Sequence, residues 1–408
     1  MNIKHIIPLI ALSVAAISVS AQNNAREAFK FAKHQTKLLL AETAKIKAAA
    51  NKPNLLSPRA LNTKGDLVMV SSKDWCSGFF PGNLWFLYEY TGDKFWKERS
   101  EPFTAEMEGE KSNTGTHDLG FMVYNSVGNA YRLTRQQKYK DDIIQTARSL
   151  ITRFNPTVGC IKSWDHQKQW QFPVIIDNMM NLELLFEATK LSGDSSFYKV
   201  AVTHANTTLK NHFRADNSSF HVINYDPETG KVLNKQTLQG FADSSAWARG
   251  QAWGLYGYTM CYRETGNKAY LAQAEKIARY IFSNPQMPPD LVPYWDFDAA
   301  KLGNQPRDAS AAAIAASALY ELSTYSKNAV TYKKTADKIL NSLGKSYQAQ
   351  PDSASGFLLL HSTGHKPANS EIDVPIIYAD YYYLEALLRQ KRLAEKRPVI
   401  NATGTLKN

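Results

Sequence analysis

The sequence predicts an all-α fold, an (α/α)6 toroid or barrel of six inner and six outer helices, with short β-hairpins in its rim loops. Two observations support this prediction. Helical segments alternate between apolar helices rich in small residues, which are typically buried, and amphipathic Lys-rich helices, which typically cover a core. A short glycine-containing phrase recurs between them, and such recurrence is the signature of a helical-hairpin repeat.

The recurring phrase is recognisable in five places. It reads YTGDKFW at Tyr90–Trp96, LSGDSSFY at Leu191–Tyr198 and ETGNKAY at Glu264–Tyr270, with looser versions at Leu133–Tyr139 and Tyr325–Tyr332. The glycine in the first three suits the left-handed position that ends an α-helix, and the aromatic residue after it begins the next apolar stripe. We therefore expect a tight helix–helix turn at each phrase.

Each phrase separates an inner helix from an outer one. The inner helices are predicted at about residues 81–91, 118–133, 177–191, 247–264, 308–323 and 374–390. The outer helices follow the phrases, and a helix at about 25–45 completes their set. The longer connections include two predicted β-hairpins, at about 159–175 and 218–240. Long loops gather at one rim in this arrangement, so we expect the functional site there.

The N-terminus has the pattern of an export signal. Lys4 precedes an apolar run, and Val19 and Ala21 occupy the small-residue positions of a cleavage site. The run is too short to span a bilayer comfortably, so we expect export to the periplasm and no membrane span. The expected organisation is a signal peptide at 1–21 cleaved after Ala21, a single catalytic domain at 22–395 and a C-terminal tail at 396–408.

Composition narrows the classes of partner. The net charge is +11 at pH 7, and the signal segment holds one Lys and no acid, so +11 − 1 = +10 remains after cleavage. The basic residues are spread over helical segments without a nucleic-acid module, so we expect an acidic polysaccharide and no nucleic acid, with solubility alone as the alternative. Cys76, Cys160 and Cys261 are scattered and odd in number, which predicts buried free thiols.

Polar residues gather at the predicted N-terminal ends of the inner helices, which face one mouth of the ring. Asp118, Asp177 and Asp308 each also suit a helix N-cap, and capping is the preferred interpretation for Asp308. Asp177 ends the apolar run of IIDNMMN, where desolvation would raise its pKa. Asp118 and Asp177 would place two carboxyl groups in one pocket, and a pair of carboxyl groups is the minimum that hydrolysis of a glycosidic bond ordinarily requires.

The segment DSSAWARGQAWGLYGY concentrates large side chains near a helix start. Trp247, Arg249 and Trp253 crowd one face there, and core packing is the usual explanation for the aromatic residues. A buried Arg between two Trp needs an anionic partner, either a substrate carboxylate or a structural acid such as Asp243.

Four loop residues suit sugar contacts. Trp75 and Trp164 are suited to stacking on sugar faces or to plugging the rim, and His221 and Gln239 are suited to hydrogen-bonding hydroxyls. The sequence contains no nucleophile elbow, HExxH, phosphate-binding Gly loop or CxxC, and its nine His lack metal-ligand spacing. We expect no metal and no cofactor.

The chain resembles glycoside hydrolase family 88, the unsaturated glucuronyl hydrolases, which include unsaturated chondroitin disaccharide hydrolases. The matching stretches cover most of the chain in order and read DWCSGFFPGNLW, HDLGFMVYNSVGNAYRLT, IIDNMMNLELLFEA, DSSAWARGQAWGLYGY, RDASAAAIAASAL and EIDVPIIYADYYYLEAL. The resemblance implies an (α/α)6 barrel that acts on lyase-generated oligosaccharides with a 4,5-unsaturated terminal uronate. An acid protonates the vinyl ether at C4, water adds at C5, and the hemiketal opens and releases the neighbouring sugar.

The resemblance also implies residue roles. The family's acid/base falls on Asp177 and its second aspartate on Asp118, whose charge would stabilise developing positive charge. It implies no metal and no cofactor. The substrate-binding residues that it implies are Trp75, His117, Trp164, His221, Gln239, Trp247, Arg249, Trp253 and Tyr378.

Three other functions compete with this one. An unsaturated rhamnogalacturonyl hydrolase shares the fold and chemistry but acts on pectin fragments, whereas the His117–Asp118 pair and the basic charge favour a glycosaminoglycan. A sugar 2-epimerase on the same toroid would need basic His groups rather than two acids. A non-catalytic glycan-binding protein would bind without turnover. Lys366, in HSTGHKP, contacts a sulfate or second sugar in one interpretation and is a solvated loop Lys in the preferred one.

Overall fold

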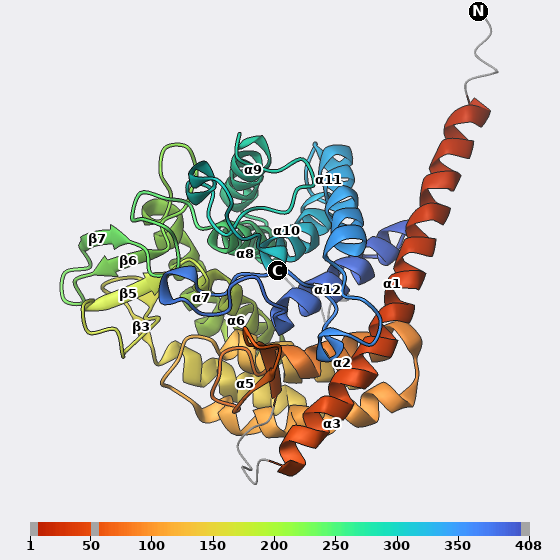
Figure 1. The fold of residues 1–408 in the computed structure, drawn as a ribbon. Helices are drawn as coiled ribbons and strands as arrows, with labels where there is room; N and C mark the ends of the chain where they lie inside the picture. Colours follow the sequence, from red (N-terminus) through yellow and green to blue (C-terminus); the bar gives the residue numbers. More distant parts are fainter. Residues whose placement is uncertain (1–6, 50–56, 401–408) are drawn as a thin grey trace, which may run out of the picture.

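The structure, a computed structural model, describes residues 7–49 and 57–400 and forms a ring of paired helices (Figure 1). Six inner and six outer helices alternate in this part of the chain, which confirms the predicted (α/α)6 fold. The inner helices are α2 (Phe79–Thr91), η3 continued by α4 (Gly120–Gly128 and Asn129–Thr134), α6 (Asn178–Ser192), α8 (Ala248–Thr265), α10 (Ala309–Leu322) and α12 (Ile377–Ala394). The outer helices are α1 (Ile7–Ala49), α3 (Lys94–Glu108), α5 (Gln137–Ile151), α7 (Ser195–Asn211), α9 (Lys268–Ser283) and α11 (Ala329–Ser342).

Each inner helix packs against the next, and α12 packs against α2, so the inner ring closes. Helix α1 contacts both α12 and α2 and covers the junction between the last and first inner helices. The inner helices are apolar because they are covered all round: every side chain of α10 is buried, whereas α11 buries three.

The recurring phrases are the tight turns at one mouth of the ring. Gly92, Gly193 and Gly266 end their helices with φ angles of 68°, 78° and 66°, a region that glycine enters without steric cost. The residue after each glycine then caps the next helix. The side chains of Asp93, Asp194 and Asn267 accept hydrogen bonds from the backbone N–H two residues further on. Each phrase therefore encodes the end of one helix and the start of another.

The strands lie in the connections ahead of the inner helices. Strand β1 (Ser57–Leu61) pairs with β2 (Leu67–Val70), and β3 (Phe154–Asn155) with β4 (Cys160–Ile161). A three-stranded sheet has the order β5-β6-β7, from Phe172–Ile175, Val222–Tyr225 and Val232–Gln236, and lies at one side of the ring (Figure 1). Short 3-10 and π segments lie at Gly109–Ser112, Ala299–Leu302, Leu343–Tyr347, Ala354–Gly356 and Lys366–Ala368.

The hairpin predicted at 218–240 is confirmed as β6–β7, whereas the pairing predicted within 159–175 is wrong. Strand β4 pairs with the preceding β3, and β5 pairs with β6 from a distant part of the chain. All four residues of β5 are buried, and so are all four of β6. Two strands buried on both faces satisfy each other's backbone groups best, which explains this choice of partner.

Other predictions concern the whole chain. Cys76, Cys160 and Cys261 are buried free thiols, as predicted. No helix within 7–49 and 57–400 is long and apolar enough to cross a membrane. Of the predicted signal peptide, residues 1–6 lie outside the described part, as do residues 401–408 of the predicted tail, and both boundaries stay predictions.

Candidate active site

The predicted site residues meet at the mouth formed by the N-terminal ends of the inner helices. Asp118 lies two residues ahead of η3, and Asp177 occupies the N-cap position of α6. Arg249 is the second residue of α8, and Tyr378 the second of α12. Because the inner helices run in one direction, four segments far apart in sequence deliver these side chains to one place.

Neither candidate catalytic aspartate caps its helix. The side chain of Asp177 makes no cap hydrogen bond, and Asp118 Oδ2 instead accepts from Thr116 Oγ1 at 3.1 Å. Asp308 is different, because its Oδ1 accepts from the backbone N–H groups of Ser310 and Ala311 at 3.1 and 3.4 Å. Capping therefore accounts for Asp308, and leaves the other two carboxylates available for chemistry.

Burial gives Asp177 the protonation behaviour of an acid catalyst. Burial raises the pKa of Asp177 from 3.8 to about 7, with the positive charge of Arg249 opposing the shift and the negative charge of Asp118 adding to it. The side chain of Asp177 is 12% exposed and that of Asp118 is 16% exposed. A carboxyl group with a pKa near neutrality can donate a proton and recover it at neutral pH.

Two neutral imidazoles accompany the carboxylates. His221 Nδ1 accepts hydrogen bonds from the backbone N–H groups of Leu238 and Gln239 at 3.1 and 3.2 Å, so its proton must reside on Nε2, which lies 3.7 Å from Asp177 Oδ2. Burial lowers the pKa of His221 well below its ordinary value, which keeps the ring neutral. His117 Nε2 lies 3.4 Å from Asp118 Oδ1, and burial lowers its pKa as well.

Aromatic rings form the walls. Trp75 packs on Tyr378 with ring centroids 5.0 Å apart and on Phe121 at 5.5 Å, and Phe121 packs on Trp253 at 5.1 Å. His221 contacts two further indoles. These are Trp164 at 5.8 Å and Trp247 at 4.8 Å.

Arg249 has structural partners in addition to any ligand. Its guanidinium, 1% exposed, donates to Asp308 Oδ2 at 2.8 Å and to the carbonyls of Thr363 and Gly364 at 2.6 and 2.5 Å. Gln239 Nε2 donates to the same Gly364 carbonyl at 3.2 Å. The structural acid expected as an alternative is therefore Asp308, not Asp243, which instead accepts from the backbone N–H of Thr237.

Seven buried polar atoms without a hydrogen-bond partner lie at this mouth, and others are spread through the rest of the described structure. The seven belong to Asp177 (Oδ2), His117 (both ring nitrogens), His221 (Nε2), Arg249 (Nε), Trp253 (Nε1) and Tyr378 (hydroxyl). Buried polar groups are ordinarily paired, because an unpaired one costs about 1–3 kcal/mol. Such a set of donors and acceptors around one carboxyl is the arrangement expected of a polar ligand site. Within the described residues, no group of three or more His, Cys, Asp or Glu is placed to hold a metal ion.

A close contact between inner helices fixes the segment that carries Asp118. Segment η3 is a π-helix, a geometry that often occurs at functional sites. The Phe121 N–H leaves the regular helical pattern and donates to Asn181 Oδ1 of α6 at 3.1 Å. A Cβ at Gly120 would lie 2.6 Å from that Oδ1, so glycine permits the approach. The two aspartates are thus related by direct η3–α6 packing.

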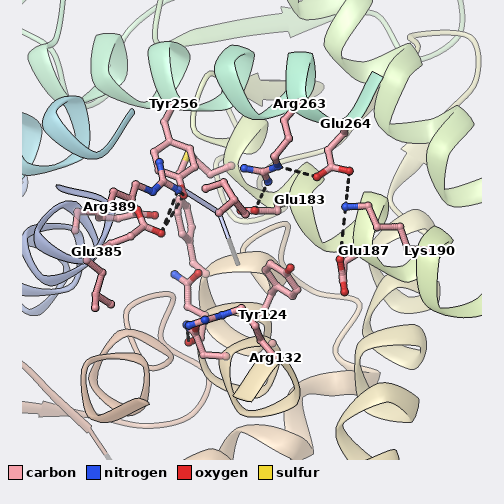
Figure 2. A pocket seen from close by; sticks show the side chains of 18 of the residues that line it. Tyr124, Arg132, Glu183, Glu187, Lys190, Tyr256, Arg263, Glu264, Glu385 and Arg389 are labelled. Atoms are coloured by element: carbon pink, nitrogen blue, oxygen red, sulfur yellow. Dashed lines mark hydrogen bonds and ion pairs between the residues drawn. The ribbon is translucent and has the colours of Figure 1, made fainter. Parts of the chain in front are cut away.

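A second cavity, of about 710 Å³, opens at the opposite mouth (Figure 2). Much of its lining comes from the C-terminal halves of the inner helices, and it carries charges that pair within the wall. Arg263 contacts Glu183, Glu264 and Glu321, and Lys190 Nζ lies 2.6 Å from Glu264 Oε2. Its mutually compensated charges mark it as a structural network of the ring.

The sequence did not reveal the three hydrogen-bond partners of Arg249, and it did not single out Asn178. Asn178, beside Asp177, has a buried Oδ1 without a partner. The carbonyls of Thr363 and Gly364 and the Asp308 carboxylate hold Arg249. Backbone carbonyls have no sequence signal. The position of Asn178 next to a candidate acid was the one available cue.

Lys366 opens the short 3-10 segment that follows Gly364, and its side chain is partly exposed. It therefore lies in the loop whose carbonyls bind Arg249.

The chain is similar to known glycosidases over most of its length. The family model of Glycosyl Hydrolase Family 88 matches residues 57–388. An unsaturated glucuronyl hydrolase of Formosa agariphila is 54% identical over 343 residues, which are 83% of this chain and 86% of that protein. An unsaturated chondroitin disaccharide hydrolase of Streptococcus agalactiae is 34% identical, over 79% of this chain and 82% of its own.

A solved structure leads to the same family. The crystal structure of an unsaturated glucuronyl hydrolase specific for heparin superposes with a TM-score of 0.84 and 47% identity, and the match covers 90% of this chain and 98% of that one. The chain is a glycosidase, and it belongs to glycosyl hydrolase family 88.

Proposed function

We propose that this protein removes the terminal 4,5-unsaturated uronate from glycosaminoglycan oligosaccharides produced by polysaccharide lyases. Membership of family 88 and its unsaturated glucuronyl hydrolase relatives support the reaction type. The observation that carries the proposal is Asp177, a buried carboxyl whose pKa of about 7 lets it act as an acid at neutral pH. Unpaired donors surround it in a pocket walled by aromatic rings.

The proposed reaction is hydration of a vinyl ether. Protonated Asp177 transfers its proton to C4, and the C4=C5 double bond becomes a C–H bond and a cation delocalised over C5 and the ring oxygen. Water attacks C5 and returns a proton to the Asp177 carboxylate, which restores the acid. The resulting hemiketal opens and the neighbouring sugar leaves.

Asp118 and the imidazoles have supporting roles in this proposal. The Asp118 carboxylate, held by Thr116, contributes negative charge where the cation develops. His221 presents an Nε2–H donor toward Asp177 without adding positive charge, because its ring is neutral. Neutrality matters, since a second cation near C5 would oppose the transition state.

Arg249 is the proposed partner of the uronate carboxylate. A guanidinium has five N–H donors, and Asp308, Thr363 and Gly364 occupy three of them. Nε–H and one Nη2 hydrogen remain, which is the number needed for bidentate contact with a carboxylate. Trp247 and Tyr378 cover its faces, with Cζ 4.5 and 5.2 Å from their ring centroids.

Heparin-derived disaccharides are the substrates we propose to test first. The solved relative specific for heparin is 47% identical to this chain, whereas the Streptococcus agalactiae chondroitin disaccharide hydrolase is 34% identical. Pectin fragments are the alternative substrate, which would make the enzyme an unsaturated rhamnogalacturonyl hydrolase.

The test is loss of the ultraviolet absorbance of the conjugated double bond. The protein is incubated with unsaturated disaccharides from heparin, chondroitin, hyaluronan and pectin. Activity on a glycosaminoglycan product supports the proposal, and unchanged absorbance with all four would refute it. Asp177→Asn should lose activity by at least about a hundredfold, the low end of general acid catalysis.

Asp380→Asn is the matched control. Asp380 is also buried with a pKa raised by burial, to about 8, but it accepts from the backbone N–H groups of Leu358 and Leu359 away from the site. It should retain its activity per folded molecule.

We also propose export to the periplasm with cleavage after Ala21. The first buried side chain described in α1 is Ala25, followed by Ala28 and Phe29. The N-terminal part of α1 extends beyond the ring in Figure 1. Cleavage after Ala21 would leave these contacts intact, and N-terminal sequencing of the exported protein would test the position.

A further inference from the structure

The orientation of Arg249 depends on one buried carboxylate. Its Nη1 donates to Asp308 Oδ2 at 2.8 Å, and neither side chain is more than 1% exposed. The other two contacts of the guanidinium, with Thr363 and Gly364, are to backbone carbonyls of a rim loop. Asp308 is therefore the one anionic side chain among its hydrogen-bond partners within the described structure.

Asp308 is itself fixed by the helix that follows it. Its Oδ1 accepts from Ser310 Oγ at 2.5 Å and from the N–H groups of Ser310 and Ala311, which leaves Oδ2 for Arg249. The first turn of α10 fixes the position of this carboxylate, and the carboxylate in turn holds the guanidinium of Arg249. The position of the guanidinium therefore depends on α10 as well as on its own helix α8. This is a more rigid arrangement than a pair of flexible side chains would provide.

We propose that Asp308 is a positioning residue: it aims the unpaired Nε edge of Arg249 into the pocket and balances the positive charge that Arg249 presents to Asp177. The inference rests on the proposed function, because it assigns Arg249 to the uronate and Asp177 to proton transfer. It adds a residue that touches neither the reacting atoms nor the substrate.

The charge balance has a predictable sign. The titratable groups around Asp177 and Arg249 come from several segments. They are Asp118 and His117 ahead of η3, His221 ahead of β6, Tyr378 in α12, Asp308 ahead of α10, His365 in the rim loop and Cys76 ahead of α2. The positive charge of Arg249 favours ionised Asp177, and the pKa of Asp177 is lower for it. The negative charge of Asp308 partly offsets the positive charge of Arg249. Without it, Arg249 stabilises ionised Asp177 more strongly, so Asp177 loses its proton at lower pH.

Asp308→Asn tests the proposal. Asn caps helices about as well as Asp, so the variant removes the charge and keeps the cap. The alkaline limb of the kcat/KM profile on an unsaturated disaccharide should move by about one pH unit toward acid, and KM should rise several-fold. Asp93→Asn, which alters the equivalent cap of α3 away from the site, should leave the profile unchanged.

A double-mutant cycle with Arg249→Met separates positioning from general damage. If Asp308 acts through Arg249, Asp308→Asn should lower kcat/KM far less in the Arg249→Met background than in the unmodified protein. Two results would overturn the inference. One is an alkaline limb of Asp308→Asn that coincides with that of the unmodified protein, and the other is a double variant whose loss of kcat/KM equals the combined losses of the two single variants. Asp308→Ser, which also retains a capping oxygen, replaces the Asn variant if that variant fails to fold by circular dichroism.

Failure of the proposed function would look different. It would appear as inactivity of the unmodified protein on every disaccharide. The proton affinity of Asp177 can then be followed without substrate, from the pH dependence of the stability difference caused by Asp177→Asn, with and without Asp308→Asn. An unchanged midpoint in that titration contradicts the charge-balance inference whatever the substrate is.

Discussion

Asp177→Asn should stabilise the fold at alkaline pH while it removes activity. The carboxyl titrates near 3.8 in an unfolded chain and near 7 in the folded protein. Because the folded-state pKa is raised, the stability associated with Asp177 is fully present below pH about 3.8 and is lost as the pH rises to 7. The gap of about three pH units, at about 1.4 kcal/mol each, corresponds to about 4 kcal/mol.

The Asn amide has a destabilising effect of its own, and comparing two pH values removes that effect from the result. A buried Asn needs an acceptor for its N–H groups, and an unmet bond costs about 1–3 kcal/mol, but this cost is the same at every pH. The quantity to measure is therefore the change in the stability difference between two pH values. Between pH 4.5 and pH 8 the difference in free energy of unfolding between Asp177→Asn and the unmodified protein should change by about 3 kcal/mol in favour of the variant.

Urea unfolding at pH 4.5 and pH 8 provides the assay. Asp194→Asn is the control, because hydrogen bonds from Ser196 lower the pKa of this exposed cap below 3.8 and its charge stabilises the fold above that unfolded pKa. Both pH values lie above 3.8, so the stability difference of the control should be nearly the same at pH 4.5 and pH 8. A stability difference for Asp177→Asn that is the same at both pH values would refute the electrostatic reasoning about the acid.

Further predictions concern pH, the opposite mouth and helix packing. The kcat/KM of the unmodified protein should fall tenfold per pH unit above about pH 7, because Asp177 must be protonated. Glu321→Ala, which strips the partner shared by two buried arginines, should cost about 3–5 kcal/mol in urea unfolding with kcat unchanged. Gly92→Ala should cost about 1–2 kcal/mol from its positive φ, whereas Gly78→Ala should cost more, since its Cβ would overlap the Met122 carbonyl.

Local chemistry explains why the ring could be predicted from the sequence. A glycine that ends one helix and a polar residue that caps the next lie within two positions, as at Gly92 and Asp93, so no distant information is needed. The direction of the inner helices then follows from connectivity, and it places Asp118 and Asp177 at one mouth.

The features that escaped prediction depend on distant partners. Strand β5 pairs with β6, which lies in the connection ahead of a different inner helix, for example with Pro173 opposite Asn224. Neither segment contains a local sequence pattern that predicts this partner. The ion pair of Arg249 with Asp308 joins two inner helices, and the sequence offered Asp243 as a closer candidate. The protonated nitrogen of His221 is set by two backbone N–H groups, which composition cannot reveal.

The position of α1 over the junction between α12 and α2 has a consequence for folding. Gln35 of α1 donates to the Phe357 carbonyl and accepts from the Asp352 N–H, and α1 also packs on α12. These contacts of α1 join residues more than three hundred positions apart, whereas its contacts with α2 come from much nearer in the sequence. Such closure is slow, because the entropy of a long loop is lost before the contacts form. The junction that α1 covers is therefore completed only when α12 has been synthesised and has packed against α2.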